Sequence, residues 1–206
     1  MNKTEKMTDT QKSSTNEETA VKNSETSGRK SQKRSMKLLV MAAMLTALCC
    51  VATLSIRIPI PSTNGYIHPG DAFVILSGVI LGPGWGFLAA GVGSALADLL
   101  GGYAFYAPGT FLIKGVIALI SAFAYRRFSK TAKTRTLGVA LGGVADMVCV
   151  TGGYLLYETA LFGFATAATA IPASLVQSGG GLILAMILYP ILFAIPDVRQ
   201  VASEIR

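Results

Sequence analysis

Four long stretches of this 206-residue chain contain no Asp, Glu, Lys or Arg, at residues 38–56, 72–97, 99–113 and 159–196. A helix that crosses a bilayer needs about 20 largely apolar residues, and three of the four stretches approach or exceed that length. Residues 38–206 carry only 15 charged side chains, too few to cover the surface of a soluble domain of this size. The sequence therefore excludes an ordinary soluble enzyme and predicts a polytopic membrane protein.

Half of the basic residues are concentrated in the first 37 residues, which carry nine Lys or Arg and five Asp or Glu. Residues 1–36 contain few large apolar side chains, so we expect a disordered, basic cytoplasmic tail there. Residues 37–197 are expected to form one all-α membrane domain, and 198–206 a short cytoplasmic tail. The membrane domain is predicted to contain six helices. They lie at about 38–56, 108–125, 137–158 and 171–195, with two shorter helices within 72–97.

The pair of helices within 72–97 is separated by the sequence GPGWG at Gly82–Gly86, which is a strong turn signal. The first half has about 11 residues and would cover only about 16 Å of a hydrocarbon core about 30 Å thick. Two short spans and one re-entrant hairpin both fit this pattern. The connection at 57–71 contains three prolines that exclude a helix and predict a structured loop.

Lys and Arg near the span ends predict the orientation, because such residues concentrate on the cytoplasmic side. Five lie in residues 29–37, five in the acid-free loop 126–135, and two more beyond 198, whereas Arg57 alone lies on the other side. Both termini are therefore expected in the cytoplasm of a multi-pass cell-membrane protein. The connections 57–71, 99–108 and 158–170 are then external.

Known catalytic and cofactor motifs are absent from the sequence. It has no P-loop, no nucleophile elbow and no metal-ligand spacing, and its three cysteines lie in apolar runs. We expect no catalytic residue, no metal, no cofactor, no disulfide framework and no nucleic-acid partner.

Ionisable side chains within membrane spans are candidates for function because burying them is costly. Asp71, Asp98, Lys114 and Glu158 are all predicted in the outer leaflet. Asp98 and Lys114 are alternatively a structural ion pair. Asp146 is predicted nearer the middle of the membrane, where we expect it to bond to neighbouring helices or backbone.

Further hydrogen-bonding side chains gather at the level of these charges. Tyr154 and Glu158 are four residues apart and share one helical face. An aromatic ring, a carboxylate and a nearby lysine suit a small, polar, ring-containing ligand, which predicts a pocket that opens outward. For any single tyrosine, the alternative is membership of the interfacial aromatic belt. The polar residues at this level are Asn64, Tyr66, His68, Tyr103, Tyr106, Tyr154, Tyr157, Gln177 and Ser178.

Two alternative functions are compatible with the same residues. In a self-sufficient secondary transporter or channel, GPGWG would form the tip of a re-entrant hairpin, and Asp98 and Asp146 would relay ions. In a membrane-embedded enzyme, Asp71, His68 and Lys114 would form an acid/base group at the outer face.

Residues 66–115 resemble the substrate-binding S components of energy-coupling factor (ECF) vitamin transporters, in the riboflavin-type branch. The similar elements are the HPGD sequence at 68–71, the Gly-Pro-x-x-Gly turn at 82–86, Ala-Asp-Leu-Leu-x-Gly-Tyr at 97–103 and Lys-Gly at 114–115. Length and the six-segment layout extend the resemblance over about 37–195.

The resemblance implies a protein that captures a water-soluble vitamin or precursor from outside, such as riboflavin, pyridoxine or hydroxymethylpyrimidine. It implies docking with a membrane coupling subunit and two cytoplasmic ATPases, through an Ala-x-x-x-Ala pattern that Ala43 and Ala47 match. Loop 57–70 would cover the pocket. The expected binding residues are Asn64 and Tyr66 in this loop, and Lys114, Tyr154, Glu158 and Gln177 on the helices.

Overall fold

The computed structural model describes residues 32–60, 65–128 and 131–204. The chain divides into two compact units, Met1–Leu39 and Val40–Arg206. Within the first unit the described residues, 32–39, are helical, so helical structure begins before the predicted boundary at 36. The rest of the predicted tail lies outside the described residues, and the following paragraphs concern the second unit.

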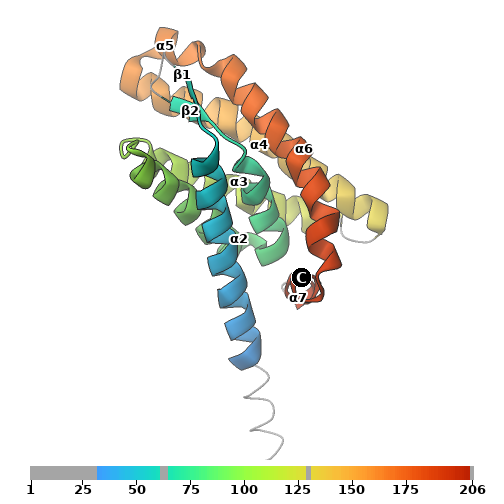
Figure 1. Cartoon of the computed structure of the whole chain (residues 1–206). Coiled ribbons are helices and arrows are strands. Elements are labelled where there is room, and N and C mark those ends of the chain that lie inside the picture. The colour runs from blue at the N-terminus through green and yellow to red at the C-terminus, as the bar shows by residue number, and fades with distance from the viewer. Residues whose placement is uncertain (1–31, 61–64, 129–130, 205–206) are drawn as a thin grey trace, which may run out of the picture. The chain divides into compact units, whose positions relative to one another are not determined.

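Almost all of the described chain is helical (Figure 1). After the N-terminal helix Gln32–Ser55 come strands β1 and β2 and helices α2 to α7. Within the described ranges, five helices are long and apolar enough to cross a membrane: the N-terminal helix, α2, α3, α4 and α6. The bounds are β1 Ile58–Ile60, β2 Gly65–Ile67, α2 Asp71–Gly101, α3 Ala107–Arg127, α4 Ala132–Phe162, α5 Phe164–Ala168, α6 Ile171–Ala194 and α7 Pro196–Glu204.

The connection that follows the N-terminal helix forms an antiparallel β-hairpin, in which Pro59 is opposite Tyr66. The predicted all-α fold therefore needs this addition. Proline excludes a helix but is tolerated on an edge strand, and both strands of a two-stranded sheet are edges. The hairpin is followed directly by His68, Pro69 and Gly70, after which α2 begins at Asp71.

Helix α2 is interrupted at Gly82, whose φ of 74° and ψ of −174° are not helical. The chain reverses there, since a Cβ placed on Gly86 would lie 2.8 Å from the Cα of Gly78. Residues eight apart in a straight helix are separated by about 12 Å. Two helical halves, 71–81 and 83–101, thus fold back on each other at the predicted turn, through small residues that permit close approach.

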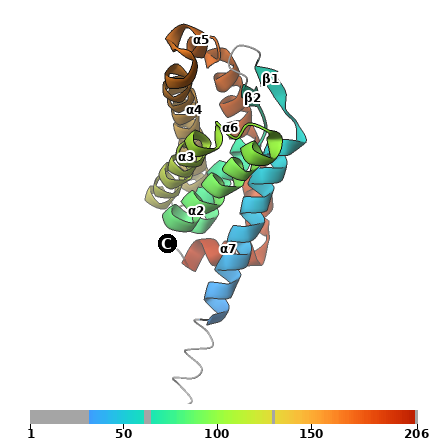
Figure 2. The same ribbon diagram turned by 90° about the vertical axis from the view of Figure 1, so that its left-hand side faces the viewer.

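The helices contact one another through small residues as well as through large apolar ones. Gly78 touches the backbone of Ala118 on α3, and Gly93 touches Thr46 on the N-terminal helix, each so closely that an added Cβ would clash. Helices α3, α4 and α6 pack in turn, and α6 also contacts α2. Figures 1 and 2 show the β-hairpin and α5 at one end of this arrangement and α7 at the other.

The distribution of side chains is opposite to that of a soluble protein. Leu100, Val148 and Leu156 are 68–75% exposed, whereas Asp71 and Lys114 are fully buried. Large apolar surface of this extent is typical of a protein whose solvent is lipid. Large apolar side chains on the outside, together with buried charged residues inside, support the membrane location predicted from the sequence.

The last residues were expected to form a tail but are helical. Val198, Val201 and Ala202 of α7 are buried, and Ala202 lines a small cavity together with Gly82. The bend in α2 therefore lies at the α7 end, opposite the β-hairpin. The apolar connection 159–170 contains the short helix α5.

Replacing Gly82 with Ala is expected to destabilise the protein by about 1–3 kcal/mol, because the backbone conformation at this position is essentially restricted to glycine. Thermal unfolding of the purified protein in detergent measures the effect. Gly84→Ala is the control, since an added Cβ meets nothing within 4 Å and alanine favours a helix. Equal stability of Gly82→Ala and wild type would contradict the prediction.

Candidate ligand-binding site

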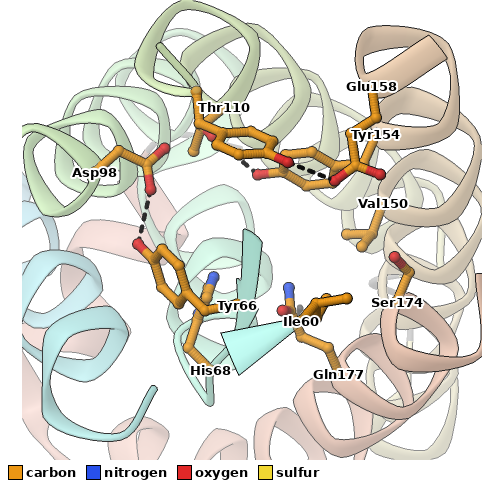
Figure 3. A pocket seen from close by; sticks show the side chains of 11 residues that line it. Ile60, Tyr66, His68, Asp98, Thr110, Val150, Tyr154, Glu158, Ser174 and Gln177 are labelled. Carbon is orange, nitrogen blue, oxygen red and sulfur yellow. Dashed lines mark hydrogen bonds between the residues drawn. The ribbon is translucent and has the colours of Figure 1, made fainter. Parts of the chain in front are cut away.

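A cleft opens at the β-hairpin end, between the hairpin and the adjacent ends of α2, α3, α4 and α6 (Figure 3). It encloses about 430 Å³ of space that no protein atom fills, including the part open to solvent. The lining residues are Ile60, Tyr66, His68, Asp98, Tyr106, Thr110, Val150, Tyr154, Glu158, Ser174 and Gln177.

Tyr66 connects the β-hairpin to the end of α2. Its hydroxyl donates a hydrogen bond of 2.7 Å to Oδ1 of Asp98, and its ring lies 4.6 Å from that of Tyr103. Burial, and the neighbouring Asp98 carboxylate, raise the pKa of the Tyr66 phenol well above its usual value. Tyr66 therefore remains a hydrogen-bond donor at physiological pH.

His68, also on the cleft wall, is held as a neutral ring. Burial lowers its pKa from 6.5 to about 4, against the opposing attraction of Asp71. The backbone N–H of Gly70 donates to Nδ1 of His68 at 3.1 Å, so the ring proton resides on Nε2. His68 thus offers an N–H donor rather than a positive charge.

A second tyrosine and carboxylate pair lies where α3 begins and α4 ends. The hydroxyl of Tyr106 donates to Oε1 of Glu158 at 2.8 Å. Beside it, the hydroxyls of Thr110 and Tyr154 are 3.0 Å apart, and the rings of Tyr106 and Tyr154 are in edge-on contact. This side of the cleft therefore offers both aromatic rings and hydrogen-bonding groups to a ligand.

Below the cleft, Gln177 connects the lining to a buried ion pair. Its Nε2 donates to Oδ2 of Asp71 at 2.8 Å, and Nζ of Lys114 donates to Oδ1 of the same carboxylate. Asp71 and Lys114 are both fully buried. The alternative pairing of Lys114 with Asp98 is wrong, because the fold back of α2 places the start of that helix, rather than its end, against Lys114.

Residues 33–193 match the family of the ECF-type riboflavin transporter S component. The chain belongs to this family. A relative from Pyrococcus woesei, described as uncharacterised, is 35% identical over 134 residues, which cover 65% of this chain and 86% of that protein.

The fold is also that of a solved S component. The structure of an S component of a bacterial ECF transporter aligns with a TM-score of 0.60 and 20% sequence identity. The alignment covers 78% of this chain and 97% of that one. As an S component, this protein is the substrate-binding subunit of an ECF transporter in the membrane.

The structure brings most of the predicted binding residues of this S component together. Tyr66, Tyr154, Glu158 and Gln177 line the cleft. Lys114 lies beneath it, sealed against Asp71, with Nζ 5.7 Å from the centre of the Tyr154 ring. Asn64 falls outside the described residues.

Other lining residues were not among the expected binding residues, although the sequence placed Asp98, His68 and Tyr106 at the level of the pocket. Asp98, Tyr106 and Thr110 each contribute a polar group, and Ser174 contributes a hydroxyl. Thr110 precedes Lys114 by four residues, so it shares a helical face with a residue already singled out. This spacing could have indicated Thr110 as a lining residue. Nothing in the local sequence distinguishes Ser174 from other serines.

Asp146 was expected to bond to neighbouring helices or backbone, and this expectation is wrong. The residue is fully buried on α4, and neither carboxyl oxygen has a hydrogen-bond partner among the described residues. It does not line the cleft. Hydropathy and depth suggested a paired carboxylate, but pairing depends on which side chains the helix packing brings near.

Replacing Lys114 with Met is expected to destabilise the S component by about 3–5 kcal/mol, because the Asp71 carboxylate is left buried without its cation. The double variant Asp71→Asn with Lys114→Met should recover most of this loss, since the two charges disappear together while the new amide can still bond to Gln177. Thermal unfolding of both variants in detergent measures the difference. Additive losses in the double variant would show that the ion pair has no such role.

Proposed function

We propose that this S component captures a water-soluble vitamin or vitamin precursor of the riboflavin, pyridoxine or hydroxymethylpyrimidine class from outside the cell. The observation that carries the proposal is the composition of the cleft, in which tyrosine rings, a histidine and paired hydroxyl and carboxyl groups face one space that is open to solvent. Aromatic faces stack on a flat heterocycle, and a few placed polar groups orient it. These three ligands share a planar ring with hydroxyl-bearing substituents.

The proposed orientation places the cleft outside and both termini in the cytoplasm of a multi-pass cell-membrane protein. The charge distribution supports it. Arg126 lines the cavity near the bend of α2, and Arg135 and Arg199 line another beside α7, all at the end opposite the cleft. Basic residues gather on the cytoplasmic side of membrane proteins. With α2 counted as two segments, six segments return the chain to that side.

Transport itself would depend on partner subunits. The sequence contains no P-loop, so ATP hydrolysis must occur in separate subunits, which we propose to be a membrane coupling subunit and two cytoplasmic ATPases. Ala43 and Ala47 are exposed, whereas Ala42 and Leu45 on the other face of the N-terminal helix are buried. A pair of small, exposed residues four apart permits close approach of another helix.

The purified full-length protein is expected to bind at least one of riboflavin, pyridoxine and hydroxymethylpyrimidine, measured by isothermal titration calorimetry. Mass spectrometry of the denatured protein should detect the same compound when it is retained during purification. Glu158→Gln should weaken binding about tenfold or more, because a carboxylate accepts a stronger hydrogen bond than an amide. Asp197→Asn, on α7 at the opposite end, is the matched control. Absence of binding for all three compounds would refute the proposal.

Ala43→Trp and Ala47→Trp are expected to abolish co-purification with the coupling subunit, and vitamin uptake, when all subunits are co-expressed. Vitamin affinity of the isolated protein should not change, because both residues are remote from the cleft lining. Val148→Trp, which adds bulk at a 68% exposed position on α4, should retain both properties. Normal uptake by the two alanine variants would exclude this docking surface.

A further inference from the structure

Asp146 lies beneath the cleft, on the side of α4 that lines it. Val150, Tyr154 and Glu158 line the cleft and follow Asp146 at successive four-residue steps, so all four residues lie along one side of the helix. Asp146 is not part of the lining, and it is fully buried. Its carboxyl group is therefore one helical turn below the cleft, inside the membrane domain.

The contacts of Asp146 are not those of an ionised carboxylate. Among the described residues, neither of its two oxygens has a hydrogen-bond partner. Asp71, which is equally buried, accepts hydrogen bonds from Lys114 and Gln177. An ionised carboxylate that is buried without such partners is very costly, and the group takes up a proton instead.

The charges around Asp146 do not neutralise it. Asp146 interacts electrostatically with Asp71 on α2 and with Lys114 on α3. The Lys114 ammonium is already bonded to Asp71, and it also interacts with Asp98 at the end of α2. Helix α6 contains no Asp, Glu, Lys or Arg. One ammonium group thus faces three carboxyl groups, and ionised Asp146 would add an uncompensated negative charge to a buried site.

The remaining titratable groups near this cluster provide no further cation. On α4 itself, the Cys149 thiol and the Tyr154 phenol interact with Asp146, and neither group carries a positive charge in any protonation state that proteins adopt. The His68 ring interacts with Asp71 and Lys114, but it is neutral at physiological pH because burial lowers its pKa to about 4.

A proton suits this position better than a metal ion does. A metal cation requires several ligands, and among the described residues no group of three or more His, Cys, Asp or Glu side chains is placed to bind one. The Lys114 ammonium would also repel a second cation. A proton needs only one oxygen of the Asp146 carboxyl group.

We propose that Asp146 is a proton-binding site in the interior of the membrane domain and the alternative counter-ion of Lys114. Two carboxyl groups that share a site do not both ionise readily, so Asp71 and Asp146 together hold one proton. While Asp71 is ionised and paired with Lys114, the proton is on Asp146. When Asp71 carries no charge, Asp146 gives its proton to solvent and pairs with the ammonium group, whose flexible stem permits a change of partner. The inference concerns residues beneath the cleft and does not depend on which ligand the cleft binds.

Infrared spectroscopy of the full-length protein in nanodiscs tests the proposal, because a protonated carboxyl group has a C=O stretching band that an ionised carboxylate lacks. At physiological pH, we expect Asp146→Asn to remove one such band from the wild-type spectrum. The amide resembles the neutral acid in shape, so the variant should unfold close to the wild-type temperature. Asp197→Asn, at an exposed carboxyl group on α7, is the matched control and should leave the Asp146 band in place.

Asp71→Asn should remove the same band although Asp146 is retained, because Asp146 then ionises and pairs with Lys114. Combining Asp71→Asn with Asp146→Asn should lower the unfolding temperature much further than either substitution alone. The double variant leaves the buried ammonium without either of its two nearest carboxylates, which is strongly destabilising. Such a non-additive loss measures the coupling between the two acids.

Each outcome supports or overturns the proposal. A carboxylic-acid spectrum that is unchanged in Asp146→Asn overturns the proton-binding site. Thermal stability that depends on Na⁺ in the wild type, and no longer in Asp146→Asn, assigns the site to a metal ion and also overturns it. Additive losses in the double variant overturn the role as alternative counter-ion. If Asp71→Asn does not fold, the spectrum of Asp146→Asn still decides whether the proton is present.

Discussion

The buried group of Asp71, Lys114 and Gln177 determines how the ligand-binding end of this S component is assembled. Two opposite charges without solvent access must satisfy each other, because the cost of removing an ion from water is several kcal/mol. One carboxylate thereby joins the start of α2 to α3 and α6, and Gln177 carries the connection up to the cleft. The cleft residues on these three helices are positioned relative to one another by this group.

The lipid environment around these helices explains how the rest of the structure is packed. In a bilayer, apolar surface gains nothing from burial between helices, so the interior relies on close backbone contact and polar bonds. Gly78 against Ala118 and Gly93 against Thr46 supply such contacts. Exposed leucines and valines on the outer helix faces then meet lipid, and polar side chains gather where they can bond to one another.

Much of the fold could be predicted from the sequence, because charge-free runs and turn signals are local properties. The helices at 107–127, 132–162 and 171–194, and the reversal at Gly82, follow from such patterns. The β-hairpin was missed because the prolines in this loop excluded a helix without indicating which structure replaces it. Pairings between distant residues, such as Lys114 with Asp71 rather than Asp98, depend on the direction in which α2 folds back, and no local pattern encodes it. The lack of a hydrogen-bond partner for the Asp146 carboxyl group among the described residues could not be predicted for the same reason.

The cleft draws its lining from segments that are far apart in the chain, between Ile60 and Gln177. An occupant that touches the β-hairpin, α2, α4 and α6 together acts as a removable cross-link between them. Ligand that binds only the folded state adds RT ln(1 + [L]/Kd) to stability, about 2.7 kcal/mol at a concentration 100 times Kd. The occupied and empty forms thus differ in how firmly their helices are held together, so ligand at concentrations well above Kd raises the resistance of this subunit to unfolding.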